Sequence, residues 1–372
     1  MKQQIANISA SLADLGLILP LTLGLALGAS MDLGALLMGL GMFALASGVI
    51  YRRPIPAQPM KVVAAMAIVG QLEPSVIQAT GILIGLSLII LAVTGWAGLL
   101  RRFVYPPVLS GIQVALGVKL FFTALPMIES TWLPVLSLLF VFIFLKATRL
   151  HPFAFILVVC LSLIMFWQAP LTSFSAKPMA ITIPHFSWPS IDAFIDSLQL
   201  VYFPQMALTL SNALLLVAVL AQSYFPEDKE RLSENRLALS SGIINLILAP
   251  FGAMPMCHGA GGLVAYHTAG GRNGLPLITL GLILLILGAF SGPAAVEYLQ
   301  MIPQASFGLL LLITASYMVD AKKLLQSKTD ERMIILIVVL IGAFYSMLAG
   351  LTAGMIGVWL YKKFRQQPSS LN

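Results

Sequence analysis

The sequence has very little charge. Only 9% of its 372 residues are Asp, Glu, Lys or Arg, whereas 59% are hydrophobic. Soluble proteins contain roughly 25% charged residues on average, so this scarcity excludes a soluble globular protein. The formal net charge of +7 does not indicate a nucleic-acid partner, because the positive residues are scattered among loops. We therefore expect a polytopic protein embedded in a lipid bilayer, with no room for a sizeable soluble domain.

Cysteines, metal-ligand clusters and signal-peptide features are equally scarce. The two cysteines, Cys160 and Cys257, lie in apolar stretches, and neither a disulfide nor a metal site is expected from their spacing. The start, Met1-Lys2-Gln3-Gln4, lacks a cleavage signature, so the first apolar run is interpreted as a retained span. No nucleophile–base pair rises above chance. We expect neither an enzyme nor a bound cofactor or metal.

Hydropathy and helix-breaking residues predict an all-α protein with fourteen membrane segments. They lie at about 11–29, 32–50, 57–70, 75–96, 105–125, 132–149, 152–168, 200–222, 237–251, 256–269, 275–292, 301–318, 333–346 and 348–361, the last two being short enough for a hairpin. An odd number of segments per half gives the two halves opposite orientations. The predicted organisation is a 7+7 inverted repeat: residues 1–168 form the first repeat, 169–199 an extracytoplasmic connection and 200–372 the second repeat.

The basic residues support this count. With the N-terminus in the cytoplasm, 18 of the 21 Lys and Arg residues fall at predicted inside positions, leaving Lys61, Lys119 and Lys177. The predicted outside turns at 29–32, 71–74, 126–131 and 293–300 hold no Lys or Arg. This is the pattern of the positive-inside rule. It predicts cytoplasmic N- and C-termini in a plasma (inner) membrane.

Two short broken stretches, about two hundred residues apart, organise the chain. The first is Pro54-Ile55-Pro56-Ala57-Gln58-Pro59-Met60-Lys61 and the second is Pro255-Met256-Cys257-His258-Gly259-Ala260-Gly261-Gly262. Irregular backbone in a bilayer is tolerated only where protein buries it or a watery cavity receives it. A half-helix that starts there directs unpaired N–H groups and the positive end of its dipole into the membrane. Segments 3 and 10 are therefore predicted to be half-helices whose facing N-termini form an anion site.

The residues proposed to bind substrate come from these two stretches and from the eighth segment. They are Gln58, Pro59, Met60, Lys61, His258, Gly259, Ala260, Gly261 and Gly262, with Gln205, Thr209 and Asn212. The last three share one helix face by their i, i+4, i+7 spacing. Asp14 and His258 are the candidates for carrying a coupling proton.

Each candidate also has a structural interpretation. Lys61 opposes the dipole in the first turn of its half-helix, which calls for an anion or a carboxylate such as Asp14, but a lysine can instead snorkel to the interface. Asp14 can be a helix cap, and a lone His258 can be a satisfied structural residue. The glycines of the second stretch can form a packing face, and the polar eighth segment can serve interhelical hydrogen bonding.

The same residues resemble a known family. Pro56-Ala57-Gln58-Pro59-Met60-Lys61 resembles the P-x-Q-P-M-K signature of the molybdate transporter family, relatives of the SulP sulfate transporters, and the run Pro255 to Leu263 is similar to its second signature, P-M-C-H-G-[AS]-G-G-L. Asp14-Leu15-Gly16 resembles the family's G-D-L-G opening, with Ala13 in place of glycine, and the stretch from Pro204 to Ala213 is similar to its polar eighth segment. The run Tyr266 to Gly274 departs from the family's usual sequence.

The resemblance implies the fourteen-segment fold of SulP proteins and uracil permeases. In that fold a core domain (segments 1–4 and 8–11) moves substrate past a gate domain (segments 5–7 and 12–14), and homodimers are common. SulP proteins often add a regulatory STAS domain, and we expect none here, because only Lys362 to Asn372 follows the last predicted span.

Together these observations predict a secondary active transporter for a tetrahedral oxyanion, with molybdate as the first candidate, held between two half-helix N-termini and working by alternating access. Uptake of a dianion against a negative interior requires a cotransported cation, and we expect H+, with Na+ as the alternative. Other candidates are a transporter for sulfate or a related anion, an organic-substrate transporter of the same fold for a nucleobase or aromatic carboxylate, and a passive anion channel. The absence of acidic residues from segments 8–10 argues against the nucleobase version.

Overall fold

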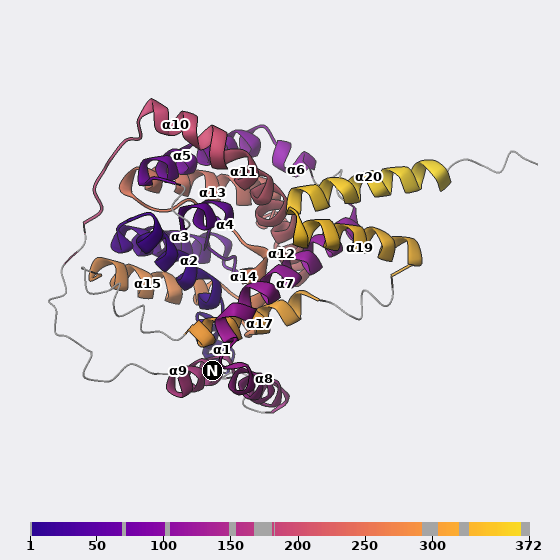
Figure 1. Cartoon of the computed structure of the whole chain (residues 1–372), viewed down its shortest axis with the longest axis horizontal. Helices are drawn as coiled ribbons and strands as arrows, with labels where there is room; N and C mark the ends of the chain where they lie inside the picture. The colour runs from indigo at the N-terminus through magenta and orange to yellow at the C-terminus, as the bar shows by residue number, and fades with distance from the viewer. Residues whose placement is uncertain are drawn as a thin grey trace, which may run out of the picture.

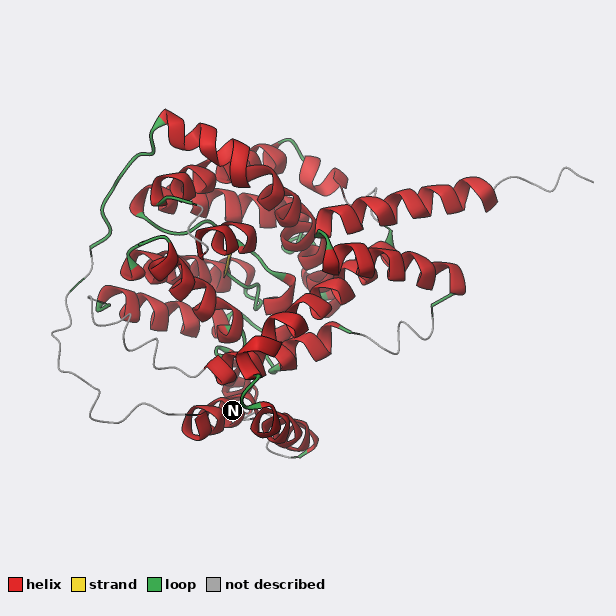
Figure 2. Cartoon of the chain, viewed as in Figure 1, coloured by secondary structure: helices red, strands yellow, loops and turns green. Residues whose placement is uncertain are grey.

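The computed structural model describes residues 2–68, 72–100, 105–148, 154–166, 181, 183–291, 304–319 and 327–365. This part of the chain is almost entirely helical (Figure 2). Three of its helices are long and apolar enough to cross a membrane, and several shorter apolar helices accompany them. The predicted all-α class is therefore confirmed for the described residues.

The first half of the chain contains the elements α1 (Lys2–Ala10), α2 (Leu15–Gly28), α3 (Leu33–Tyr51), β1 (Gln58–Pro59), α4 (Lys61–Ile68), α5 (Pro74–Val93), α6 (Trp96–Leu100), α7 (Pro106–Ile128), α8 (Trp132–Ala147) and α9 (Ala154–Phe166). The second half contains α10 (Ile191–Ser197), η4 (Leu198–Tyr202), α11 (Phe203–Leu208), η5 (Thr209–Leu216), α12 (Val217–Tyr224), η6 (Pro226–Asp228), α13 (Glu234–Leu248), η7 (Ala249–Phe251), β2 (Met256–Cys257), α14 (Ala260–Thr268), α15 (Leu275–Ala289), α17 (Gln304–Met318), α19 (Thr329–Phe344) and α20 (Met347–Arg365).

Every predicted segment contains a helix, but two boundaries are wrong. The first segment, predicted from residue 11, becomes helical only at Leu15: residues 11–14 form a turn that separates α1 from α2 and places Asp14 immediately before α2. The eighth segment begins at Ile191 instead of residue 200, so the predicted connection 169–199 is too long. Ser190 caps this helix by accepting from the Ala193 N–H at 3.2 Å. Residues 169–180 and 182 of the connection lie outside the described part.

The eighth segment runs through two π-helical turns. η4 and η5 alternate with α10, α11 and α12 along the range 191–224. Pro204 in α11 has no N–H to donate, so a regular α-helical ladder is interrupted there. π turns often occur at functional sites, and η5 contains two of the predicted site residues, Thr209 and Asn212.

Helices from the two halves pack in matched pairs. α3 packs against α15 and α5 against α13, while α7 packs against α17 and α19 (Figure 1). The first two pairs meet at glycines. A Cβ atom on Gly41 would lie 2.9 Å from the Gly281 carbonyl oxygen, and one on Gly85 would lie 2.9 Å from the Gly242 carbonyl oxygen. Small residues allow such close backbone approach in membrane helix pairs. α19 and α20 form the predicted hairpin.

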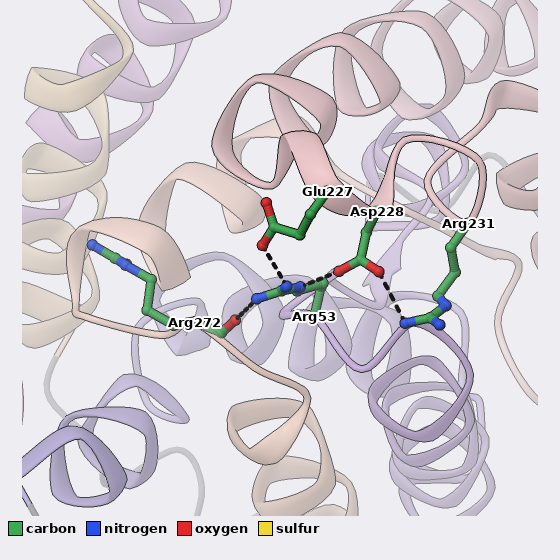
Figure 3. A network of polar contacts seen from close by, with 5 residues as sticks. All are labelled: Arg53, Glu227, Asp228, Arg231 and Arg272. Carbon is green, nitrogen blue, oxygen red and sulfur yellow. Dashed lines mark hydrogen bonds and ion pairs between the residues drawn. The ribbon is translucent and has the colours of Figure 1, made fainter.

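An arginine network joins the segments that lead into and out of the two half-helices (Figure 3). Arg53, just before the first broken stretch, donates to Glu227 Oε1 and Asp228 Oδ2, both at 2.6 Å, and to the Arg272 carbonyl oxygen at 2.8 Å. Asp228 also pairs with Arg231 at 3.1 Å. Glu227 and Asp228 follow α12, and Arg272 follows α14. One guanidinium therefore fixes three connections on the predicted cytoplasmic side.

Replacing Arg53 with Gln is expected to destabilise the fold by about 1–3 kcal/mol, because a neutral amide cannot make three charge-assisted bonds in this geometry. The thermal unfolding midpoint of purified protein measures this change. Arg231→Gln is the matched control, since it removes one pair between residues three apart, which contributes about 0.3–0.5 kcal/mol. Equal shifts in the two variants would contradict a central role for Arg53.

Candidate functional site

The two broken stretches pair with each other. β1 and β2 form a two-stranded antiparallel sheet in which Gln58 faces Cys257 and Pro59 faces Met256. The Met60 N–H then donates to the Pro255 carbonyl oxygen at 2.9 Å. α4 starts at Lys61 and α14 at Ala260, directly after the strands. The predicted breaks are thus confirmed, and the N-termini of both half-helices lie close together in the interior.

Polar side chains from neighbouring helices hold the strands in place. Asn245 of α13 accepts from the Met256 N–H at 2.7 Å and donates to the Met256 carbonyl oxygen at 2.6 Å. Ser47 of α3 donates to the Ile55 carbonyl oxygen at 2.5 Å. These bonds satisfy backbone groups that would otherwise be unpaired inside a membrane. Sequence reasoning missed both residues, although a buried Asn in an apolar segment is a signal for such a role.

The Gln58 side chain connects Asp14 with Lys61. Its Nε2 atom donates to Asp14 Oδ2 at 2.5 Å, and its Oε1 atom accepts from Lys61 Nζ at 3.2 Å. Asp14 and Gln58 are buried, and Lys61 is half-buried. Since an amide has one donor end and one acceptor end, these partners fix the orientation of Gln58. Two opposite charges joined through an amide are less costly inside a membrane than either charge alone.

Two glycines at the start of α14, the N-cap residue Gly259 and Gly262, make room for these linked side chains. A Cβ atom on Gly259 would overlap Gln58 Oε1, and one on Gly262 would overlap Asp14 Oδ2 and lie 2.5 Å from Gln58 Nε2. A Cβ atom on Gly261 would meet only Leu120, at 3.5 Å. Gly259 and Gly262 therefore allow the Asp14 and Gln58 side chains to lie directly against the first turn of α14, where the helix dipole favours negative charge.

The eighth segment contributes Gln205, Thr209 and Asn212, all buried. Gln205 Oε1 accepts from the N–H groups of Val62 at 2.8 Å and Val63 at 3.4 Å, and its Nε2 donates to Thr209 Oγ1 at 3.0 Å. The predicted shared face of Gln205 and Thr209 is thus confirmed. Asn212 Oδ1 has no hydrogen-bond partner among the described residues.

His258 makes structural contacts with both ring nitrogens. Nδ1 lies 2.7 Å from the Pro56 carbonyl oxygen, and Nε2 lies 2.8 Å from Ser240 Oγ. Phe43 and Tyr51 pack against the ring. Because a carbonyl oxygen can only accept, Nδ1 carries the proton. In this arrangement the predicted donation from His258 to an anion is unsupported, since no ring nitrogen is left for it; its structural alternative fits better.

His258→Gln is therefore expected to leave the pH profile of uptake unchanged while lowering the thermal unfolding midpoint. The expected loss of stability is about 1–3 kcal/mol, the cost of leaving a buried partner unsatisfied. Initial uptake rates between pH 5 and 8, together with thermal unfolding of the same preparation, measure both quantities. A displaced pH profile in a normally stable variant would assign the proton to His258 after all.

The structure brings together the strand and half-helix residues of both broken stretches, Asp14, Gln205 and Thr209. It turns His258 away from them. Tyr266 is a residue that sequence reasoning missed: it lies one turn beyond Gly262 on α14, is fully buried, and its hydroxyl has no partner within the described ranges. A tyrosine in an apolar segment is a weak signal, because its ring suits a packed interior equally well.

Comparison with known proteins gives a consistent result. Residues 6–120 and 198–318 match the family described as the molybdate transporter of the MFS superfamily. The chain is 30% identical over 379 residues to molybdate transporter 2 of Arabidopsis thaliana, covering 88% of this chain and 80% of that protein. It is 27% identical over 421 residues to molybdate transporter 1 of the same plant, covering 100% and 91%. A putative sulfate transporter of Bacillus subtilis is 25% identical over 64% of this chain and 50% of its own length.

Solved structures show the same fold. Murine Solute Carrier 26 family member A9, an anion transporter, matches with a TM-score of 0.68 at 14% identity, over 98% of this chain and 69% of that one. The transmembrane domain of the cyanobacterial bicarbonate transporter BicA matches with a TM-score of 0.59 at 16% identity, over 94% of this chain and 96% of that domain.

Proposed function

The chain belongs to the molybdate transporter family of the MFS superfamily, and from this premise we propose that it takes up molybdate by alternating access. It is an integral, multi-pass membrane protein with the fold of known anion transporters. The tetrahedral dianion binds where α4 and α14 begin. Backbone N–H groups at helix N-termini bind such anions readily, and the ammonium of Lys61 adds attraction.

One observation carries the proposal: the hydrogen-bonded Asp14–Gln58–Lys61 chain lies beside the paired starts of the two half-helices. Lys61 supplies a positive charge at this point, and Gln58 has a second N–H to offer an oxyanion. The glycines at 259 and 262 let these groups approach α14 closely. The arrangement has charge and hydrogen-bond donors for a small anion, and its Lys61 is not buried completely.

Asp14 is the proposed coupling residue. Inward movement of a dianion against 100 mV costs about 4.6 kcal/mol, twice the value for one charge. A dianion and an ionised carboxylate repel each other at close range, and a proton on Asp14 removes that repulsion. Protonation and anion binding therefore favour each other, which is the thermodynamic requirement for cotransport.

Movement of a core against a gate supplies alternating access in this proposal. The core comprises α1 to α5 and α10 to α15, and the gate comprises α7 to α9 with α17, α19 and α20. Two helix pairings support an inverted repeat. In such a repeat α3 is equivalent to α13, and α5 is equivalent to α15. The packing of α3 against α15 then has its counterpart in the packing of α13 against α5. We further propose the inner membrane as the location, with both termini cytoplasmic, on the basis of the basic residues.

Uptake into proteoliposomes tests the proposed substrate. Labelled molybdate should accumulate under an inward proton gradient at zero membrane potential. Unlabelled molybdate and tungstate should compete strongly, sulfate less strongly and uracil not at all. Sulfate is the second candidate, favoured by the similarity to the putative sulfate transporter. Stronger competition by uracil than by the inorganic anions would indicate an organic-substrate transporter. Uptake that follows the membrane potential and does not respond to the proton gradient would indicate a channel.

A further inference from the structure

We propose that Gln205 is a positioning residue that caps α4, so that the oxyanion is held mainly by the first turn of α14 and by Lys61. This inference rests on the proposed function, because it divides the roles of the two half-helices in that site. It changes the symmetric picture of two equivalent helix ends. Gln205 then acts on the anion through α4 instead of touching it.

Three backbone donors at the start of α4, those of Met60, Val62 and Val63, already have acceptors. The Met60 N–H donates to the Pro255 carbonyl oxygen, and the N–H groups of Val62 and Val63 point to Gln205 Oε1 at 2.8 and 3.4 Å. The first N–H groups of a helix have no acceptor within the helix itself. Gln205, from a distant part of the chain, therefore does for α4 what an N-cap side chain does for an ordinary helix.

The Gln205 amide is held in one orientation. Thr209 Oγ1 donates its single proton to the backbone carbonyl oxygen of Gln205 at 2.9 Å. The same hydroxyl oxygen must then accept in its other contact, the one at 3.0 Å from Gln205 Nε2. This leaves Oε1, the acceptor end, facing α4. Gln205 is only 1% exposed, so water does not offer the amide an alternative partner.

The start of α14 differs in this respect. Its N-cap residue is Gly259, which has no side chain, and no side-chain cap is present there. The first residues of α14 are Ala260, Gly261 and Gly262. Leu263, the next residue, donates to the Gly259 carbonyl oxygen at 3.1 Å. The N–H groups of the first three are the donors that a helix leaves without internal partners. Since Asp14 and Gln58 also lie against this turn, α14 is the half-helix whose start is built for an external acceptor.

Hydrogen–deuterium exchange resolved to single amides tests the division of roles, using full-length protein with and without molybdate. In the anion-free state, Gln205→Met should accelerate exchange at Val62 and Val63 by about tenfold, the usual effect of losing one hydrogen bond. Gln205→Glu keeps an acceptor oxygen and should retain the protection. Gln222→Met is the matched control, because it removes another buried Gln. Gln222 lies in α12 and donates to the Leu232 carbonyl oxygen at 3.1 Å. This variant should leave Val62 and Val63 unchanged.

Addition of molybdate to the wild type should slow exchange at residues 260–262 and leave Val62 and Val63 unaffected. In Gln205→Met, the anion should protect Val62 and Val63 as well, because the acceptor that excluded it is gone. Equal protection of both helix starts in the wild type would overturn the inference, as would unchanged anion-free exchange in Gln205→Met.

If molybdate protects neither helix in the wild type, the proposed function and the division of roles both fail. Exchange at Val62 and Val63 without molybdate, compared between the wild type and Gln205→Met, then still shows whether Gln205 caps α4. If Gln205→Met does not fold, the wild type with and without molybdate and the Gln205→Glu variant decide the inference between them.

Discussion

Replacing Lys61 with Ala is expected to lower the ratio of maximal molybdate uptake rate to KM on the order of 10²-fold. Removing one partner of a buried charge interaction costs about 2–5 kcal/mol, and each 1.4 kcal/mol is a factor of ten in binding. In this protein the loss has two parts. The anion loses the nearest positive charge, and Gln58 Oε1 loses its donor. Initial rates of uptake into proteoliposomes over a range of molybdate concentrations measure the effect, which should appear mainly in KM.

Lys119→Ala is the matched control for Lys61→Ala. Lys119 also lies in an apolar helix, α7, and is also half-buried, but the structure gives its side chain no bond to the Asp14–Gln58 pair. This variant should keep its KM within about twofold of the wild type, as expected for a residue that makes no direct contact with the anion. A wild-type KM in Lys61→Ala, or equal losses in the two variants, would remove Lys61 from the site.

The two half-helices are predictable from sequence because prolines interrupt otherwise apolar runs. The prolines are Pro54, Pro56 and Pro59 in one half and Pro255 in the other. Each restricts the backbone and lacks an N–H donor, so a regular helix cannot continue through the bilayer at these positions. The pairing of Gln58 with Cys257 follows only from the fold. The predicted anion site requires that the two breaks lie side by side, and the β1–β2 pair brings them together.

Side-chain partners inside the site were less predictable. The orientation of His258 depends on its contacts with Pro56 and Ser240. His258 and Pro56 are 202 positions apart, and no local sequence pattern predicts a contact over that separation. Polarity in an apolar helix marks Gln205 as a candidate site residue, but that signal does not distinguish a ligand of the anion from a cap of a neighbouring helix. The break before α2 was also missed, because residues 11–14 contain neither Gly nor Pro.

A single added methyl group provides the sharpest test of the site geometry. Gly262→Ala is expected to reduce molybdate uptake about 10²-fold, because a displacement of the functional side chains by roughly 1 Å has an effect of this size. Its Cβ atom would overlap Asp14 Oδ2 and lie 2.5 Å from Gln58 Nε2, so the Asp14–Gln58 bond must break or α14 must move. Overpacking of this kind also costs about 1–3 kcal/mol of stability.

The adjacent Gly261→Ala is the control for Gly262→Ala, because it adds the same methyl group to the same turn of α14. Its Cβ atom would meet only Leu120, at an ordinary 3.5 Å. Both variants keep their backbone N–H groups, so loss of helix donors cannot explain a difference between them. Uptake by Gly261→Ala should be at least about tenfold faster than uptake by Gly262→Ala, because its methyl group does not overlap a neighbouring side chain. The two rates are compared in proteoliposomes that contain equal amounts of protein. Equal activity of the two would mean that the Asp14–Gln58 contact against α14 is irrelevant to transport, and the anion would then have to bind elsewhere.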